Sequence, residues 1–483
     1  MCRPSRWIFL IFACVFGLPL SAAIHNVDNK NSLCNDLSGQ PFCQISAALN
    51  AASNGDEIRI GSGIYFDNLV IDKKILIAGI EDQAVIIDAD HRSNVIRVEP
   101  GVHAQIKNIT LQHGSAENGG GIYNEGSLLI NNVNVINNVA KFSGGGIYNA
   151  SSVSGSLFIK KSTVQFNQSL GNDVRNIKYG GGGIFSDAPL FIENSMIRNN
   201  VAVDNGGGIY SIFSGRKKSS DGEKIAEKLG ISTKPKRQRT LNRKKDLGAV
   251  SIKQSDISHN QSNAGGGIYM HGVMKIKNAT ISHNYATNGL RSAGGGLFVH
   301  FDTTLDMSNV LLNFNKASFR GGGVRFYSVG IGKFHNVSII DNAIELGYGE
   351  GAGFFIIKGE KSLELGNTLI ARNFVKEKIL DDCRGNFISL GNNYLSSIKH
   401  CAGYDASLDI YQHYEPTQSI YQWNEKLQRY AVPVHSPLVD KGSQTNCVNA
   451  LGKNIIDDVY GQKRRITTEL NKNTGCSIGA IEY

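Results

Sequence analysis

The sequence lacks several features of ordinary globular and membrane-spanning chains. Its 483 residues include only 9 prolines and 2 tryptophans but 55 glycines, a balance more typical of a repeat protein than of a mixed globular domain. After the first 23 residues, no stretch reaches the roughly 18 apolar residues that a membrane-spanning helix requires. CxxC spacing is also absent, which argues against a structural zinc site.

The first residues have the layout of a secretory signal. Arg3 and Arg6 precede an apolar run over residues 7–20, and Ser21, Ala22 and Ala23 follow it. We therefore expect cleavage after Ala23. The protein is then secreted, or held at a cell surface or in the periplasm.

Cysteines outside this signal fall into three pairs that are close in sequence. An even number of cysteines in an exported chain favours disulfides, each worth roughly 2 to 4 kcal/mol in the chain-entropy model. These disulfides would fasten both ends of the molecule. The predicted pairs are Cys34 with Cys43, Cys383 with Cys401, and Cys447 with Cys476.

Net positive charge is concentrated in one segment. Residues 215–246 contain twelve Lys or Arg against four Asp or Glu, and this excess accounts for nearly all of the net charge of +9. The segment is dense in charge and poor in apolar residues, so it is either a site for a polyanion or a solvated loop. The candidate polyanion-binding residues are Lys234, Lys236, Arg237, Arg239, Arg243, Lys244 and Lys245.

A glycine cluster followed by an aliphatic residue recurs along the middle of the chain. Most intervals lie between 25 and 37 residues, and the single interval of 59 contains the basic segment, which is therefore an insertion. The clusters begin at Gly119, Gly144, Gly181, Gly206, Gly265, Gly294, Gly321 and Gly351.

Asparagines recur in a register of their own. An aliphatic residue stands three positions before an Asn at Asn138, Asn167, Asn200, Asn260, Asn284, Asn315, Asn342 and Asn373, and six residues earlier a second Asn is common. Asn tolerates left-handed turn conformations, and stacked amides can form hydrogen-bonded ladders. Short alternating stretches between these marks indicate strands with one buried face.

These patterns predict an all-β fold, a right-handed parallel β-helix of the pectin-lyase-like kind with coils of roughly 27 residues. A single coil is too short to bury its apolar face, but stacked coils, about 4.8 Å apart, share one aliphatic core. A leucine-rich horseshoe would need a shorter, leucine-dominated period. Residues 44–53 read as a short amphipathic helix that caps the open N-terminal end of the core.

Three motifs resemble known bacterial families. The segment from Cys43 to Asn50 resembles the Cys-Ser-Leu-Arg-Glu-Ala-Ile segment of secreted β-helix proteins, although Ser46 and Ala47 replace Arg-Glu. Residues 436–442, 458–464 and 476–482 are similar to the choice-of-anchor Q module. The repeats resemble those of chlamydial polymorphic outer-membrane proteins, which are surface adhesins. These resemblances imply a pectin-lyase-like fold in an extracellular or cell-envelope setting, but no particular reaction.

The expected organisation has four parts. Residues 1–23 are the signal peptide, 24–57 an N-terminal cap with a short helix, and 58–380 the parallel β-helix with its insertion at 214–247. Residues 381–483 form a disulfide-fastened C-terminal module that resembles choice-of-anchor Q.

One aromatic column is a candidate ligand-binding stripe. The residue after each aliphatic of the glycine cluster should point outward by alternation, and exposed rings at regular spacing suit stacking against sugars. The other interpretation is a structural stack that only supports the coils. The candidate residues are Tyr123, Tyr148, Phe185, Tyr210, Tyr269 and Phe298, after which Arg325 interrupts the column.

The sequence gives little support for a catalytic or metal-binding site. His259 and His283 should lie one above the other, but no third ligand accompanies them, so exposed turn residues are the favoured interpretation. The carboxylates, among them Asp256 and Asp341, fall at unrelated phases of the repeat, whereas a lyase or hydrolase needs converging acidic groups. We assign no catalytic residue, metal or cofactor from the sequence.

The sequence therefore favours a non-catalytic extracellular or envelope protein that is adhesin-like or binds polysaccharide, with a polysaccharide or a host or cell surface as its partner. Polysaccharide lyase or glycoside hydrolase activity is the alternative, and a spacer that binds nothing strongly is a third possibility.

Overall fold

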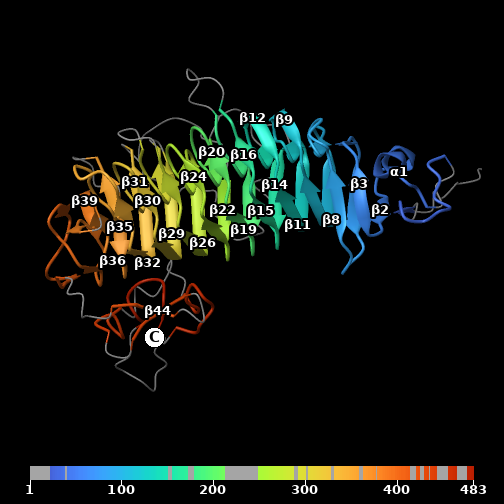
Figure 1. Ribbon diagram of the computed structural model, residues 1–483. Coiled ribbons are helices and arrows are strands. Elements are labelled where there is room, and N and C mark those ends of the chain that lie inside the picture. The colour runs from blue at the N-terminus through green and yellow to red at the C-terminus, as the bar shows by residue number, and fades with distance from the viewer. Residues whose placement is uncertain are drawn as a thin grey trace, which may run out of the picture.

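The computed structural model describes residues 22–37, 41–150, 155–171, 179–212, 249–287, 292–300, 303–327, 331–357, 363–376, 378–413, 420–424, 429–433, 436–442, 455–464 and 476–482. Over these ranges the chain forms a right-handed parallel β-helix with a short helix at its N-terminal end and a module beside its C-terminal coils (Figure 1). The fold class predicted from the repeat is confirmed.

Sheet A is the longest wall of the solenoid. Its strands pair in parallel from one coil to the next, and several are bent in the middle by a residue with positive φ. The strands are β1 (Ile24–Val27), β2 (Glu57–Ile60), β3 (Gly63–Phe66), β5 (Ile75–Gly79), β6 (Val85–Asp88), β8 (His103–Gln112), β11 (Ser127–Ile136), β14 (Ser156–Lys160), β15 (Thr163–Gln165), β18 (Leu190–Glu193), β19 (Met196–Arg198), β22 (Ala249–Lys253), β23 (Asp256–Ser258), β26 (Val273–Ser282), β29 (Thr304–Asn313), β32 (Ile331–Ile340), β35 (Leu363–Gly366), β36 (Leu369–Ala371), β40 (Ile388–Ser389), β41 (Tyr394–Leu395) and β43 (Ile410–Tyr411).

Two further sheets complete each coil. Sheet B contains β4 (Leu69–Ile71), β7 (Ile96–Val98), β10 (Ile122–Asn124), β13 (Ile147–Asn149), β17 (Ile184–Ser186), β21 (Ile209–Ser211), β25 (Ile268–Met270), β28 (Leu297–Val299), β31 (Val324–Phe326), β34 (Phe354–Ile356), β39 (Cys383–Asn386) and β42 (Cys401–Ala402). Sheet C contains β9 (Ser115–Asn118), β12 (Val139–Ser143), β16 (Gln168–Ser169), β20 (Val201–Ala202), β24 (Gln261–Ser262), β27 (Tyr285–Ala286), β30 (Lys316–Ala317), β33 (Ala343–Ile344), β37 (Phe374–Val375) and β38 (Ile379–Leu380).

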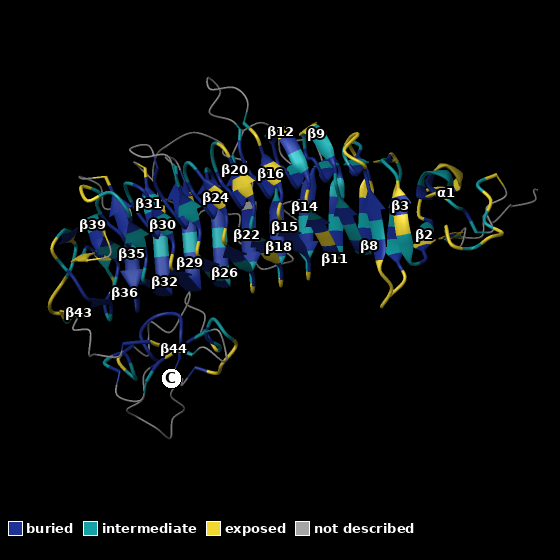
Figure 2. Ribbon diagram, viewed as in Figure 1, coloured by how far each residue is buried: buried dark blue, intermediate teal, exposed yellow. Residues whose placement is uncertain are grey.

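The core is a set of aliphatic columns that run along the solenoid axis. Ile130 of β11 pairs in register with Ile106 and Ile159, and all three are fully buried. Figure 2 shows this alternation as buried residues between half-buried or exposed ones along the strands. Burial of such a side chain contributes about 1.5 to 3 kcal/mol. A single coil cannot bury these side chains by itself, so this stabilisation depends on the neighbouring coils.

The predicted asparagine ladder is present at the corner between sheets A and C. Asn260 donates from Nδ2 to Oδ1 of Asn284 over 3.0 Å and accepts from Nδ2 of Asn200 over 3.0 Å. The same contact repeats from Asn138 to Asn373, where the carboxylate of Asp382 accepts the last amide over 2.9 Å. Because these groups are buried, their mutual hydrogen bonds hold successive coils in register.

The glycine cluster is required where sheet C turns into sheet B. Gly206 has a φ of 61°, which non-glycine residues rarely adopt. A Cβ atom on Gly207 would lie 2.5 Å from the carbonyl oxygen of Gly266 in the next coil. Glycine therefore allows both the turn and the close approach of the coils.

The helix α1 (Ile45–Ala51) covers the N-terminal end of the core. Ile45, Ala48 and Leu49 are buried and belong to the same apolar cluster as the first coils. Lys73 donates from Nζ to the carbonyl oxygens of Leu49 and Ala52 at the end of the helix. The expected capping helix is therefore confirmed.

The C-terminal module lies against the outer face of the last sheet A strands (Figure 1). It contains the antiparallel hairpin β44 (Gln422–Asn424) and β45 (Arg429–Ala431). Its apolar cluster joins Leu311 and Ile340 of the solenoid to Tyr421 and Ile478 of the module. Arg464, whose side chain is fully buried, pairs with Glu482 at 3.2 Å.

Candidate functional site

The predicted aromatic column exists, but its rings are largely covered. In sheet B the candidate residues pair coil by coil, and neighbouring ring centroids are 4.7 to 5.4 Å apart. Tyr123 and Tyr148 are half-buried. The other four are buried, with exposed fractions of 3% for Phe185, 3% for Tyr210, 6% for Tyr269 and 7% for Phe298.

The expectation that this column is exposed is therefore wrong for those four residues. The rings do point away from the aliphatic core, but each one contacts its neighbours in stacked or edge-to-face geometry. Together with Ala293 they form a buried cluster, against which Ala264 packs. Burial raises the pKa of Tyr148 to about 12 and raises that of Tyr210 further. Binding of a ligand by the column stays a prediction.

Two of the predicted disulfides are present. Cys34 is bonded to Cys43, and Cys383 is bonded to Cys401. Cys476 is also disulfide-bonded, while its predicted partner Cys447 lies outside the described residues. The candidate polyanion site lies outside them too: Lys234, Lys236, Arg237, Arg239, Arg243, Lys244 and Lys245.

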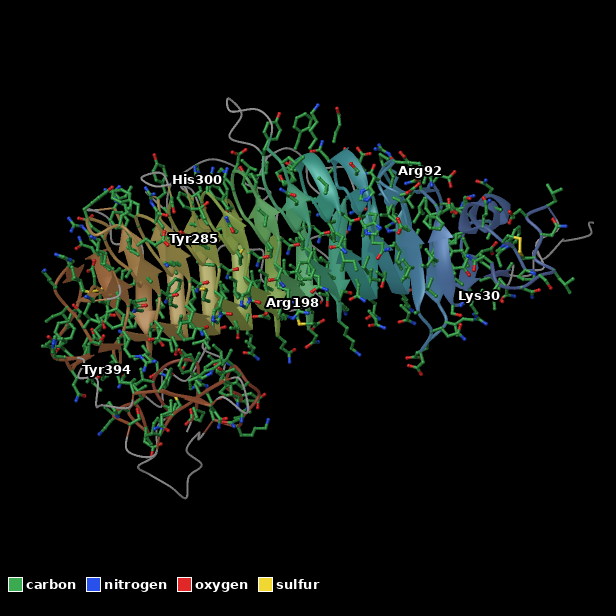
Figure 3. The ribbon with its side chains drawn as sticks, viewed as in Figure 1. Lys30, Arg92, Arg198, Tyr285, His300 and Tyr394 are labelled. Carbon is green, nitrogen blue, oxygen red and sulfur yellow. A yellow bond between two sulfur atoms is a disulfide. The ribbon has the colours of Figure 1, made fainter. Side chains whose placement is uncertain are left out.

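A cleft of about 560 Å³ lies between the solenoid and the C-terminal module. Its floor is the outer face of β19, β23, β26 and β29, and Trp423 of β44 and Tyr460 line it from the module. Figure 3 shows Arg198 at the edge of the solenoid on the side of the module. Clefts between two packed units are common binding sites.

The module positions Trp423 through aromatic packing. The Trp423 ring centroid lies 5.1 Å from that of Tyr430 and 6.3 Å from that of Phe314, both in edge-to-face geometry. Tyr430 in turn donates from its hydroxyl to Asp341, which pairs with Arg372 at 2.7 Å. Trp423 is thus held in place while 40% of it stays exposed.

Polar groups line the cleft floor in register. His259 and His283 stack with their ring centroids 4.7 Å apart and their planes within 3°, as the repeat predicts. Both histidines are exposed. Each precedes a ladder asparagine and has positive φ, 56° and 54°, so the buried ladder fixes where these rings project.

Asp256 and Arg198 lie beside the histidines. The Arg198 Nε donates to Oε1 of Gln165 over 2.9 Å, and the Ser258 hydroxyl donates to Asp256. Burial raises the pKa of Asp256, although the hydrogen bond from Ser258 and the charges of His259 and Arg198 oppose this. The cleft therefore offers both donors and acceptors beside an exposed aromatic ring.

Sequence reasoning missed this cleft. It placed the two histidines correctly, and Asp256 does fall at a phase unrelated to that of Asp341. The residues that complete the cleft, Trp423 and Tyr460, come from the module, which does not follow the repeat. The only available signal was Trp423 itself, one of two tryptophans in the chain.

Among the described residues, no group of three or more His, Cys, Asp or Glu is arranged to hold a metal ion. The helical part of the described structure contains no apolar segment of membrane-spanning length.

No protein-family model and no curated protein matches this sequence. A solved structure described as "The complex structure of XylC with xylose" aligns over 95% of this chain and 98% of that chain, with 10% sequence identity and a TM-score of 0.40. The fold assignment therefore depends on the strand register of this chain.

Proposed function

We propose that this protein is a non-catalytic, extracellular or cell-surface β-helix protein that binds polysaccharide, and that the cleft beside Trp423 holds the sugar chain. The observation that carries the proposal is the combination of an exposed tryptophan with Arg198, Asp256, His259 and His283 in one open cleft. Sugars present apolar faces to aromatic rings and hydroxyl groups to polar side chains.

The shape of the cleft favours a long ligand over a small one. It is open to solvent on the outer face of sheet A, and its lining residue Asp256 pairs in register with Met196 of the neighbouring strand. Met196 is 39% exposed and Phe166 is 54% exposed on this path. Exposed apolar side chains in line with a cleft suit a polymer that runs across several coils.

An extracellular setting agrees with the disulfides. Disulfides form and persist in oxidising compartments, and Cys34–Cys43 and Cys383–Cys401 lie near the two ends of the solenoid. Removal of residues 1–23 as a signal peptide, attachment through a choice-of-anchor Q-like module and an adhesin-like role belong to this proposal.

The test is a binding panel of neutral and acidic polysaccharides with residues 24–483. Replacement of Trp423 by Ala should lower the affinity about tenfold, because stacking on one ring is worth about 0.5 to 1.5 kcal/mol beyond the area it buries. Phe66→Ala is the control, since Phe66 is 65% exposed but lies on β3, far from the cleft. The proposal fails if no glycan binds, or if Trp423→Ala and Phe66→Ala have the same effect.

Asp256 favours polysaccharide cleavage as the second candidate function. A carboxyl group with a raised pKa beside Arg198 and His259 could donate a proton to a leaving oxygen. The same panel should be assayed for new chain ends with wild type and Asp256→Asn. Cleavage that Asp256→Asn abolishes would establish an enzyme and overturn the non-catalytic assignment.

A further inference from the structure

The aromatic column of sheet B ends at a pair of arginines. Arg325 occupies the column position after Phe298 and before Phe355. Arg320 lies in the turn just before the same strand, bridged to Ala293 and Glu350 of the neighbouring coils. This corner is distinct from the cleft: Figure 3 shows His300, whose ring stacks on Tyr327 near Arg325, on the opposite edge from Arg198.

Both guanidinium groups stack on the same ring. The Cζ of Arg320 lies 4.9 Å and that of Arg325 5.9 Å from the centroid of Phe355. The Cζ of Arg325 also lies 5.3 Å from the ring centroid of Phe298, the preceding residue of the column. A stacked aromatic ring attracts the guanidinium cation through its face. The N–H groups point outward in the guanidinium plane, so the ring does not accept hydrogen bonds from them.

Neither arginine has a carboxylate partner in the described part of the chain. The Nε atoms of Arg320 and Arg325 are buried without a hydrogen-bond acceptor. Glu350, which forms a backbone bridge with Arg320, pairs through its carboxylate with Arg384 at 2.7 Å instead. Burial and the charge of Arg320 lower the pKa of Arg325 to about 10. Two cations held together without an anion are costly, and a bound oxyanion would offset this cost.

The other end of the same column provides a comparison. Arg97 pairs with the Tyr123 position in register, and its Cζ lies 4.6 Å from the Tyr123 ring centroid. Unlike Arg325, it is neutralised by Glu99 at 2.8 Å and Glu125 at 2.7 Å. The stacked arginine at one end is therefore satisfied by the protein, and the pair at the other end is not.

We propose that Arg320 and Arg325 form a second binding site, which takes the carboxylate or sulfate group of an acidic polysaccharide. Planar guanidinium groups match the spacing of oxygens in such anions and can donate two parallel hydrogen bonds. The geometry of the two arginines is the evidence for an oxyanion site. Its assignment to a polysaccharide rests on the proposed function.

The test compares wild type with the double variant Arg320→Gln/Arg325→Gln and with Arg97→Gln as the matched control. The probes are polygalacturonate, dextran sulfate, neutral dextran and sulfate ion alone, measured by calorimetry at two salt concentrations. The double variant should lose at least tenfold in affinity for one of the two acidic polymers. The affinity of Arg97→Gln should stay within about twofold of that of wild type, because Arg97 is already ion-paired with Glu99 and Glu125.

Three results would overturn the proposal in distinguishable ways. Equal affinity of the double variant and wild type for both acidic polymers would remove the site. Binding of sulfate ion that the double variant loses, with no polymer bound, would keep an oxyanion site but remove the polysaccharide assignment. Loss of glycan binding in Trp423→Ala but not in the double variant would support the cleft and contradict the second site.

Folding of the double variant must be checked separately. Since the arginines have no carboxylate partner, their replacement should leave the midpoint of thermal unfolding unchanged or slightly raised. Arg325→Lys keeps the charge but not the planar fork, so it should recover only part of the lost affinity. Full recovery by lysine would contradict bidentate recognition.

Discussion

The aromatic column of sheet B and the cleft beside sheet A are both built from outward-pointing residues in register, yet only the cleft is open. In the column, rings 4.7 to 5.4 Å apart cover one another, and Ala293 belongs to the same buried cluster. In the cleft, His259 and His283 stay exposed, and the module adds an exposed Trp423. A side chain that points away from the core is therefore not necessarily accessible to a ligand.

The largest effect that separates the two regions should come from Phe185→Ala. Removal of a buried aromatic ring costs about 3 to 5 kcal/mol of unfolding free energy, because the stack on either side cannot close the gap. Denaturant titration measures this loss, and the affinity for glycan should not change. If glycan affinity falls while stability is unchanged, the column is a binding surface after all and the comparison is reversed.

Asn260→Ala should cost almost as much, about 3 kcal/mol. It removes the acceptor of Asn200 and the donor to Asn284, so several buried groups lose their partners. Asn199→Gly next to the ladder is the control, since Asn199 is only half-buried and glycine adopts its positive φ without strain. Equal unfolding midpoints for the two variants would show that the ladder does not hold the coils in register.

The smallest effect should be an acid-side loss of stability that originates in the cleft. Burial and the charge of His259 lower the pKa of His283, so the unfolded chain binds a proton more readily than the folded one. The contribution of His283 to stability should therefore be complete above about pH 6.5 and be lost as the pH falls below that value. His259, Asp256 and Arg198 are the other charged groups in the same cleft.

His283→Asn should reduce this decline, because Asn does not titrate and occupies the same bend at Asn137 and Asn199 with similar φ. Unfolding midpoints at pH 7.5 and pH 5 would show it. An unchanged pH dependence in the variant would assign the acid sensitivity to other groups.

The sequence predicts the solenoid well because its order is repetitive. The two asparagine positions, the glycine clusters and the even cysteines each follow a period or a pairing rule, and the coils, the ladder and two disulfides are confirmed. The sequence also predicts that the basic segment is an insertion within one coil. In agreement, β18 pairs with β22 in register across it, with Ile192 opposite Ile252.

The candidate site was harder to predict, for two physical reasons. Alternation gives the direction of Phe185 and Tyr210 but not what covers them, which depends on how closely the rings of neighbouring coils approach. Trp423 and Tyr460 belong to a module without repeats, and their place over the cleft follows from packing between residues far apart in sequence, such as Tyr421 with Leu311.

Intrinsic fluorescence tests the central claim most directly. Residues 24–483 contain a single tryptophan, Trp423, so its emission reports on the cleft alone. Titration of a bound polysaccharide should shift or quench this emission with the same midpoint as binding measured by calorimetry. Saturating binding of a polysaccharide with no change in Trp423 emission would contradict the account.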